Sequence, residues 1–135
     1  MTQCYFQTSV VPVFKDLHNL WYQWDDTKKK CIKIVPNNIS SIFNSVSLAH
    51  WIMEDGYYHK VKNVIILSTD CFSEVDCKKL VKAISTLGVV RTVNKHSKKN
   101  KTFRIRISRK SMPLLIDLIK PHMHFCFYYK LGKYQ

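Results

Sequence analysis

Two carboxylates and a glycine, Glu54-Asp55-Gly56, follow a stretch that predicts a helix running from a capping serine, Ser45 or Ser47, to Met53. The C-terminal end of a helix carries partial negative charge, which disfavours Glu54 and Asp55 there unless a cation lies close by. A divalent metal ion beside phosphate groups would supply that charge. Carboxylates followed by glycine also occur in ordinary turns. The residues therefore predict either a metal-binding acid or a plain turn.

Basic residues are the second chemical signal of the chain. The formal net charge is +13, from 22 Lys and Arg against 9 Asp and Glu. The interval between Asp76 and Asp117 has no acidic residue, and its cations are Lys78, Lys79, Lys82, Arg91, Lys95, Lys98, Lys99, Lys101, Arg104, Arg106, Arg109 and Lys110. A cluster of this kind is typical of a phosphate-binding surface and favours nucleic acid over a merely solvated face.

The spacing of apolar and basic residues predicts the secondary-structure elements that position these cations. Residues 102–108 alternate, with Phe103, Ile105 and Ile107 on one face and Arg104, Arg106 and Ser108 on the other. This period predicts a half-buried strand whose open face presents two arginines about 7 Å apart. Residues 89–95 predict a second strand with Arg91 and Lys95 on one face, and residues 96–101 a polar turn. A basic antiparallel hairpin results.

Further elements are predicted before and after this hairpin in the sequence. A buried strand is predicted over 62–69, and a helix begins at the cap Ser73 and stops at Gly88. Another helix is expected to begin at the cap Ser111, with Pro113 in its first turn.

Several classes of protein are excluded by composition. The apolar runs are too short for a membrane-spanning helix, and no secretory signal begins the chain. The 5 cysteines are odd in number and form no CxxC, which indicates reduced thiols rather than disulfides or structural zinc. His122 and His124 form a pair with no third ligand at a metal-binding spacing.

The order of these pieces, together with Leu48-Ala-His-Trp-Ile-Met-Glu-Asp-Gly56, resembles the LAGLIDADG homing endonuclease and maturase family. The segments 14–22, 33–38, 68–73, 107–113, 120–123 and 129–131 resemble further stretches of that family in the same order. The resemblance implies an α+β fold, a single αββαββα unit with a basic antiparallel β-saddle. Residues 45–135 would form this domain, and residues 1–44 a lead-in similar to the family's inter-unit linker.

The resemblance also implies a site. Asp55, assisted by Glu54, would hold Mg²⁺ at the scissile phosphate. Lys110 would be the basic group near the attacking water, with Arg109 as second choice. Lys110 could instead contact phosphate without taking part in the chemistry. Leu48, Ala49, Ile52 and Met53 would meet the motif helix of a second unit. The expected nucleic-acid contacts are Lys60, Lys62, Arg91, Lys95, Lys98, Lys99, Lys101, Arg104, Arg106 and Arg109.

Departures from the family pattern leave the function open. Glu54 and His50 replace small residues of the motif, and only one motif is present, so the chain resembles a C-terminal half that requires a partner. The first hypothesis is a split or dimeric homing endonuclease that makes Mg²⁺-dependent cuts in a long DNA site. The alternatives are an RNA-binding module, such as a maturase or a structural protein of an organellar ribosome, and a DNA binder without catalysis. Members of this family are often encoded in organellar introns, which suggests a mitochondrial location.

Overall fold

The computed structural model describes residues 5–97 and 100–135, and the chain divides into two compact units, Met1–Ile34 and Val35–Gln135. The boundary of the compact units therefore lies at Val35 rather than at residue 45. The reason is that Val35 and Ile39 are buried and the short helix α2 (Ile39–Ile42) packs on a helix of the second unit. No helix within the described residues is long and apolar enough to cross a membrane.

The first unit consists of one helix and one hairpin. Helix α1 (Pro12–Trp21) begins with a proline in its first turn, where the missing N–H costs nothing. Strands β1 (Tyr22–Asp25) and β2 (Lys30–Lys33) pair antiparallel, with Tyr22 opposite Lys33. The Asp25 carboxylate accepts the backbone N–H groups of Thr27 and Lys28 at 2.9 and 3.0 Å, which closes the turn between the strands.

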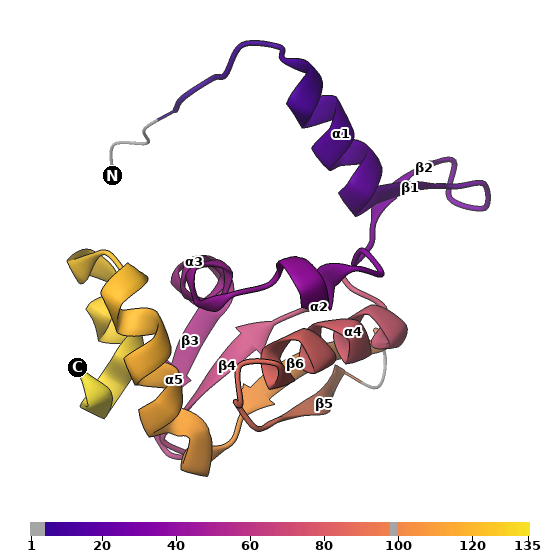
Figure 1. Cartoon of the computed structure of the whole chain (residues 1–135). Coiled ribbons are helices and arrows are strands. Elements are labelled where there is room, and N and C mark those ends of the chain that lie inside the picture. The colour runs from indigo at the N-terminus through magenta and orange to yellow at the C-terminus, as the bar shows by residue number, and fades with distance from the viewer. Residues whose placement is uncertain (1–4, 98–99) are drawn as a thin grey trace. The chain divides into compact units, whose positions relative to one another are not determined.

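The second unit confirms the predicted αββαββα order (Figure 1). Its elements are α3 (Ser45–Asp55), β3 (Gly56–His59), β4 (Val64–Ser68), α4 (Glu74–Ser85), β5 (Arg91–Ser97), β6 (Thr102–Ile107) and α5 (Met112–Ile119). The strands form one antiparallel sheet in the order β3-β4-β6-β5. Three 3₁₀ segments complete the unit: η1 (Arg109–Ser111), η2 (Lys120–His122) and η3 (Phe125–Tyr134).

The core lies between one face of this sheet and the helices. Ile105 and Ile107 of β6 are fully buried, as the alternation predicted, and α4 packs against β5 and β6. α3 packs against β3, β4 and α5. Burial also raises the pKa of the Cys77 thiol on α4, so this cysteine behaves as a small apolar core residue.

Two predicted helix caps are corrected by the structure. Asn44, not Ser45 or Ser47, caps α3, because its side chain accepts the Ser47 N–H at 2.9 Å. Ser111 is the N-cap residue of α5, as predicted, but its side chain makes no cap hydrogen bond; its hydroxyl instead accepts the Val90 N–H at 2.9 Å and ties the start of α5 to the residue before β5. Both differences arise because several polar residues precede each helix. The local backbone conformation decides which of their side chains reaches the free N–H groups of the helix.

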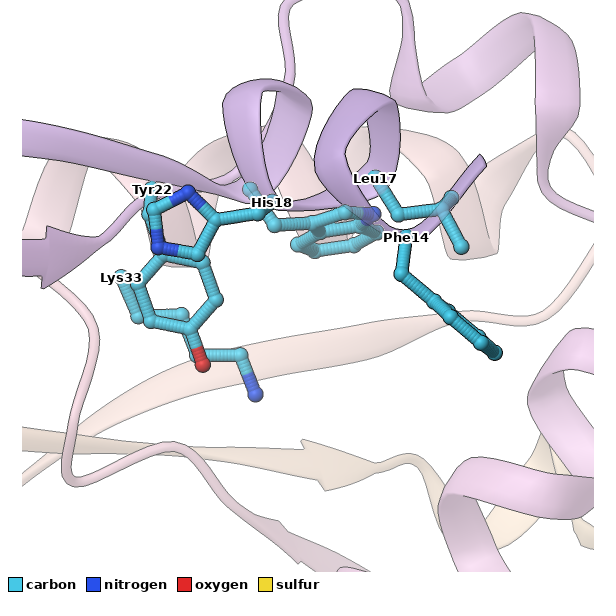
Figure 2. Close-up of a pocket in the computed structure, with 6 residues that line it drawn as sticks. Phe14, Leu17, His18, Tyr22 and Lys33 are labelled. Atoms are coloured by element: carbon cyan, nitrogen blue, oxygen red, sulfur yellow. The ribbon is translucent and has the colours of Figure 1, made fainter. Parts of the chain in front are cut away.

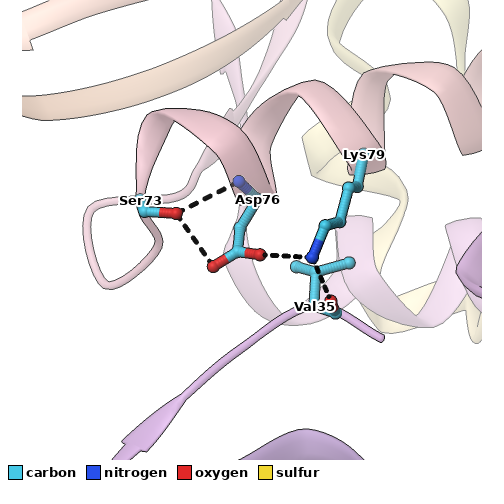
Figure 3. Close-up of polar contacts among 4 residues, drawn as sticks. All are labelled: Val35, Ser73, Asp76 and Lys79. Carbon is cyan, nitrogen blue, oxygen red and sulfur yellow. Dashed lines mark hydrogen bonds and ion pairs between the residues drawn. The ribbon is translucent and has the colours of Figure 1, made fainter. Parts of the chain in front are cut away.

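The predicted cap of α4 is confirmed and extended (Figure 3). The Ser73 hydroxyl accepts the Asp76 N–H at 3.1 Å and donates to the Asp76 carboxylate at 2.9 Å. The Lys79 ammonium donates to the same carboxylate at 3.2 Å and to the carbonyl oxygen of Val35 at 3.0 Å. These contacts fasten the segment that enters the second unit onto the first turns of α4.

Candidate nucleic-acid interface and acidic site

The acidic site lies where α3 passes directly into β3. Glu54 and Asp55 end the helix, and both side chains are exposed. Gly56 allows the direct passage, since a Cβ atom there would lie 2.6 Å from the carbonyl oxygen of Ile52. Among residues 5–97 and 100–135, no hydrogen bond or ion pair engages the carboxylate of Glu54 or Asp55. Both are therefore available to a ligand.

A lysine that sequence reasoning missed supplies the cation that these carboxylates require. The Lys130 ammonium of η3 donates to the carbonyl oxygens of Ile52 at 3.3 Å, Glu54 at 3.2 Å and also Met53. It thus caps the negative end of the α3 dipole beside the two acids. The sequence did single out Lys130, because the segment 129–131 belongs to the family resemblance. Its contact with the motif could not be predicted, because the two segments are far apart in the sequence.

The pKa of Lys130 reflects this location. Burial lowers the pKa of its amine, while the charges of Asp55 and Glu54 act in the opposite direction. The lowered pKa makes the Lys130 ammonium a readier proton donor than that of an ordinary surface lysine.

Lys110, the predicted basic group, is not brought to Asp55. Gly56 pairs with Leu67, which pairs with Ile105, so the strand β6 leaves the acidic end of the sheet as it runs to Ile107. Lys110 lies beyond that point, in η1, and is exposed. The strand spacings place it roughly 10 Å or more from Asp55. The same holds for Arg109, because both follow the end of β6 in the same turn.

Arg104 and Arg106 lie on the open face of the sheet, as predicted. Arg106 pairs with Ile66 and Arg104 with Ser68, which places Arg104 at the same end of the sheet as Asp55. The Arg104 guanidinium is 3.4 Å from the Asp70 carboxylate and lies over the Tyr57 ring, 5.8 Å from its centroid. Its Nε is buried and has no hydrogen-bond partner among the described residues. These contacts hold the arginine in place before any ligand binds.

Arg91 is on the other face and corrects the prediction for β5. It pairs with Ile107, on the core side, and its Nε donates to the carbonyl oxygen of Val81 on α4 at 2.7 Å. The β5 residues opposite Arg104 and Arg106 are Asn94 and Thr92. Lys95 pairs in backbone register with Phe103; its side chain, and all of Lys98 and Lys99, lie outside the described residues.

The remaining predicted cations are exposed in turns at both ends of the sheet. Lys60 and Lys62 lie between β3 and β4, at the end where η1 carries Arg109 and Lys110. Lys101 lies in the turn between β5 and β6, at the end that carries Asp55. A ligand that followed the sheet from end to end would meet positive charge along its whole path.

The helix face expected to meet a partner is corrected. Leu48, Ala49, Ile52 and Met53 are buried in the core of this chain, at 0, 0, 0 and 8% exposure, so they offer no surface to a second helix. The exposed face of α3 carries Val46, His50 and Glu54 at a spacing of one helical turn.

The acidic site offers few metal ligands by itself. The described part of the chain contains no group of three His, Cys, Asp or Glu side chains that could hold a metal ion. Asp55 and Glu54 nevertheless supply exposed carboxylate oxygens, which suit Mg²⁺, an ion that takes one or two protein carboxylates and completes its shell with water and phosphate oxygens.

Known proteins are similar to this chain in sequence or in fold. The model of the LAGLIDADG DNA endonuclease family matches residues 1–115. The chain is 32% identical over 132 residues to the probable intron-encoded DNA endonuclease 3 of Mycosarcoma maydis, with 96% of this chain and 93% of that protein covered. It is 30% identical over 130 residues to the cytochrome b mRNA maturase bI2 of Saccharomyces cerevisiae, with 96% of this chain covered.

The lengths differ. The chain spans only 30% of that maturase and 46% of the maturase bI2 of Debaryomyces hansenii. The solved structure of the homing endonuclease I-WcaI bound to its DNA recognition sequence shares the fold, with a TM-score of 0.72 at 21% identity. That match covers 87% of this chain and 51% of the I-WcaI chain.

Proposed function

Because the chain belongs to the LAGLIDADG DNA endonuclease family, we propose that it binds a long duplex DNA site and, paired with a second such unit, cuts it with Mg²⁺. The observation that carries this proposal is the exposed Asp55 carboxylate beside the Lys130 ammonium, at the end of the sheet that also presents Arg104. An acid, a cation and a phosphate-binding strand meet there.

The binding surface is the open face of the sheet. Arg104 and Arg106 contact phosphates or base edges, and the turn residues Lys60, Lys62 and Lys101 extend the contact toward both ends. Arg91 has no part in it, because its guanidinium is held against α4.

At the acidic site Asp55 would hold Mg²⁺, with Glu54 as the second candidate ligand. The ion would polarise the scissile phosphate and favour deprotonation of the attacking water. Lys130, in place of Lys110, holds the helix end that carries the acids.

The partner is a second LAGLIDADG unit. One Asp55 serves one strand, and the match to about half of the DNA-bound I-WcaI chain supports the need for another half. The exposed face of α3, formed by Val46, His50 and Glu54, is the surface that would receive the partner's motif helix. Intron-encoded relatives support a mitochondrial location.

The test is Mg²⁺-dependent nicking of a duplex selected from a random library for tight binding. Asp55→Asn should abolish nicking and leave the Kd for that duplex within about twofold, because the exposed acid adds no favourable contact to phosphate. Asp117→Asn, an exposed acid on α5, is the matched control and should nick normally. Normal nicking by Asp55→Asn would refute the catalytic assignment.

The second candidate is an RNA-binding module without catalysis, which is supported by the two mRNA maturases among the relatives. It predicts nanomolar binding of structured RNA and no nicking of any selected duplex. Filter binding with both ligands separates the two functions.

A further inference from the structure

The first unit carries an aromatic surface that the proposed DNA site does not use. α1 has no buried residue, and Phe14, Leu17 and Tyr22 are exposed. With His18, Trp21 and Lys33 these residues line a cavity of about 380 Å³. Figure 2 shows the His18 ring lying over the Tyr22 ring, with Phe14 and Leu17 farther along the helix and Lys33 next to Tyr22. The two stacked rings are 4.7 Å apart and inclined by 7°.

The hairpin extends this surface with a second ring. Tyr22 and Trp24 are two residues apart on β1, so they share one face and lie about 7 Å apart. Their cross-strand partners on that face are Lys33 and Cys31. The Trp24 side chain is 55% exposed, and its Nε1 donates to the Asp26 carboxylate at 3.0 Å, which fixes the ring. Aromatic rings spaced along an exposed strand are the platform on which small sheet domains stack successive unpaired bases.

Positive charge lies next to these rings in the hairpin. Lys28 and Lys29 lie in the turn and Lys33 shares the face of the rings, while Lys30, opposite Asp25, lies on the other face. Asp25 accepts the backbone N–H groups of the turn and lies 3.9 Å from the Lys28 ammonium, and Asp26 accepts the Trp24 indole N–H. An uncharged protein segment laid on the rings would desolvate the nearby ammonium groups without replacing their water, whereas a phosphate backbone would neutralise them.

We propose that the first unit binds unpaired nucleotides of a single-stranded nucleic acid. One base enters the cavity against Tyr22 and Phe14, the adjacent base stacks on Trp24, and the hairpin lysines contact the phosphates between and beyond them. The proposal is independent of the cleavage proposal, since it uses neither α3 nor the sheet of the second unit. It gives the chain a duplex-binding surface and a separate single-strand-binding surface.

The test uses the full chain and fluorescein-labelled oligonucleotides, U12 and dT12, with binding followed by anisotropy. Tyr22→Leu and Trp24→Leu keep an apolar side chain but remove the ring, and each should weaken binding roughly tenfold. Tyr22→Phe and Trp24→Phe keep a ring and should stay within about threefold of the wild type. Tyr129→Leu, an exposed aromatic of the second unit, is the matched control and should leave the Kd unchanged.

Several outcomes decide the proposal. Ring-removing variants that bind U12 and dT12 like the wild type would overturn it, as would variants that lose duplex binding to the same extent. A change in self-association by sedimentation, with oligonucleotide binding unchanged, would mean that a protein covers this surface and would also overturn it. Tighter binding of U12 than of dT12 identifies RNA as the ligand, and equal binding identifies a sugar-independent site; both support the proposal. Failure to nick DNA has no bearing on these measurements.

Discussion

At the scale of single residues, the acidic motif depends on Lys130, a residue near the other end of the second unit's sequence. Two carboxylates at the negative end of a helix oppose its dipole, and Lys130 removes that conflict by donating to the last carbonyl oxygens of α3. Lys130 thus fixes the backbone of the helix end that carries the two acids, while their carboxylates stay exposed.

Replacing Lys130 tests this dependence. Lys130→Met should lower the free energy of unfolding by about 1 kcal/mol, because the α3 carbonyl groups lose a charged donor. It should also slow nicking more than it weakens DNA binding. Lys133→Met, in the same 3₁₀ segment and exposed, is the control and should change neither quantity. Chemical denaturation and nicking rates provide the measurements.

The pH dependence follows from the lowered pKa of Lys130. Between that lowered value and the ordinary value of 10.5, the unfolded chain binds more protons at this lysine than the folded chain does. The unfolding free energy of the wild type, relative to Lys130→Met, should therefore rise with pH in that interval. A difference that shrinks as the pH rises would mean that the pKa of Lys130 is raised, not lowered.

At the scale of elements, α4 is held at its first turns by one buried carboxylate. Asp76 is 7% exposed and binds the cap residue Ser73 and the ammonium of Lys79, which in turn holds Val35. Asp76→Ala should lower the free energy of unfolding by about 2 kcal/mol, since a cap and a charged partner are lost together. Glu74→Ala removes only an exposed ion pair with Lys78 and should cost about 0.5 kcal/mol. Equal losses in urea denaturation would contradict the buried network.

Strand β6 decides which cations face a ligand. The double variant Arg104→Ala/Arg106→Ala should weaken duplex binding and lower the slope of log K against log salt by about 2, one unit for each phosphate contact. Lys78→Ala/Lys82→Ala removes the same charge from α4, which packs on the opposite face of the sheet, and should leave the slope nearly unchanged. An unchanged slope in the arginine variant would place the binding surface elsewhere.

At the scale of the whole molecule, the proposed second unit would dock on the exposed face of α3. Val46 and Leu114 are both apolar and both 43% exposed, the first on α3 and the second on α5. Val46→Glu should abolish dimer formation by the chain, because it adds a buried charge next to Glu54 and its counterpart. Leu114→Glu should dimerise normally. Analytical ultracentrifugation with selected duplex separates the two outcomes, and a Val46→Glu dimer would move the interface off α3.

Much of this protein could be predicted from its sequence because the signals are local. The period-two alternation of residues 102–108, the Ser73 cap and the helix ending in Glu54-Asp55-Gly56 each depend on neighbours a few residues apart. These patterns predicted the basic strand and the helix that ends in the acids, while the αββαββα order came from the family resemblance.

Only the tertiary structure decided which groups meet. It turned Arg91 toward α4, separated Lys110 from Asp55 and brought Lys130 to the end of α3. It also placed Leu48, Ala49, Ile52 and Met53 in the core and left Val46, His50 and Glu54 exposed on α3. The physical reason is that a periodic pattern separates two faces of an element but does not say which partner covers each face. Strand register and helix packing across distant segments make that choice.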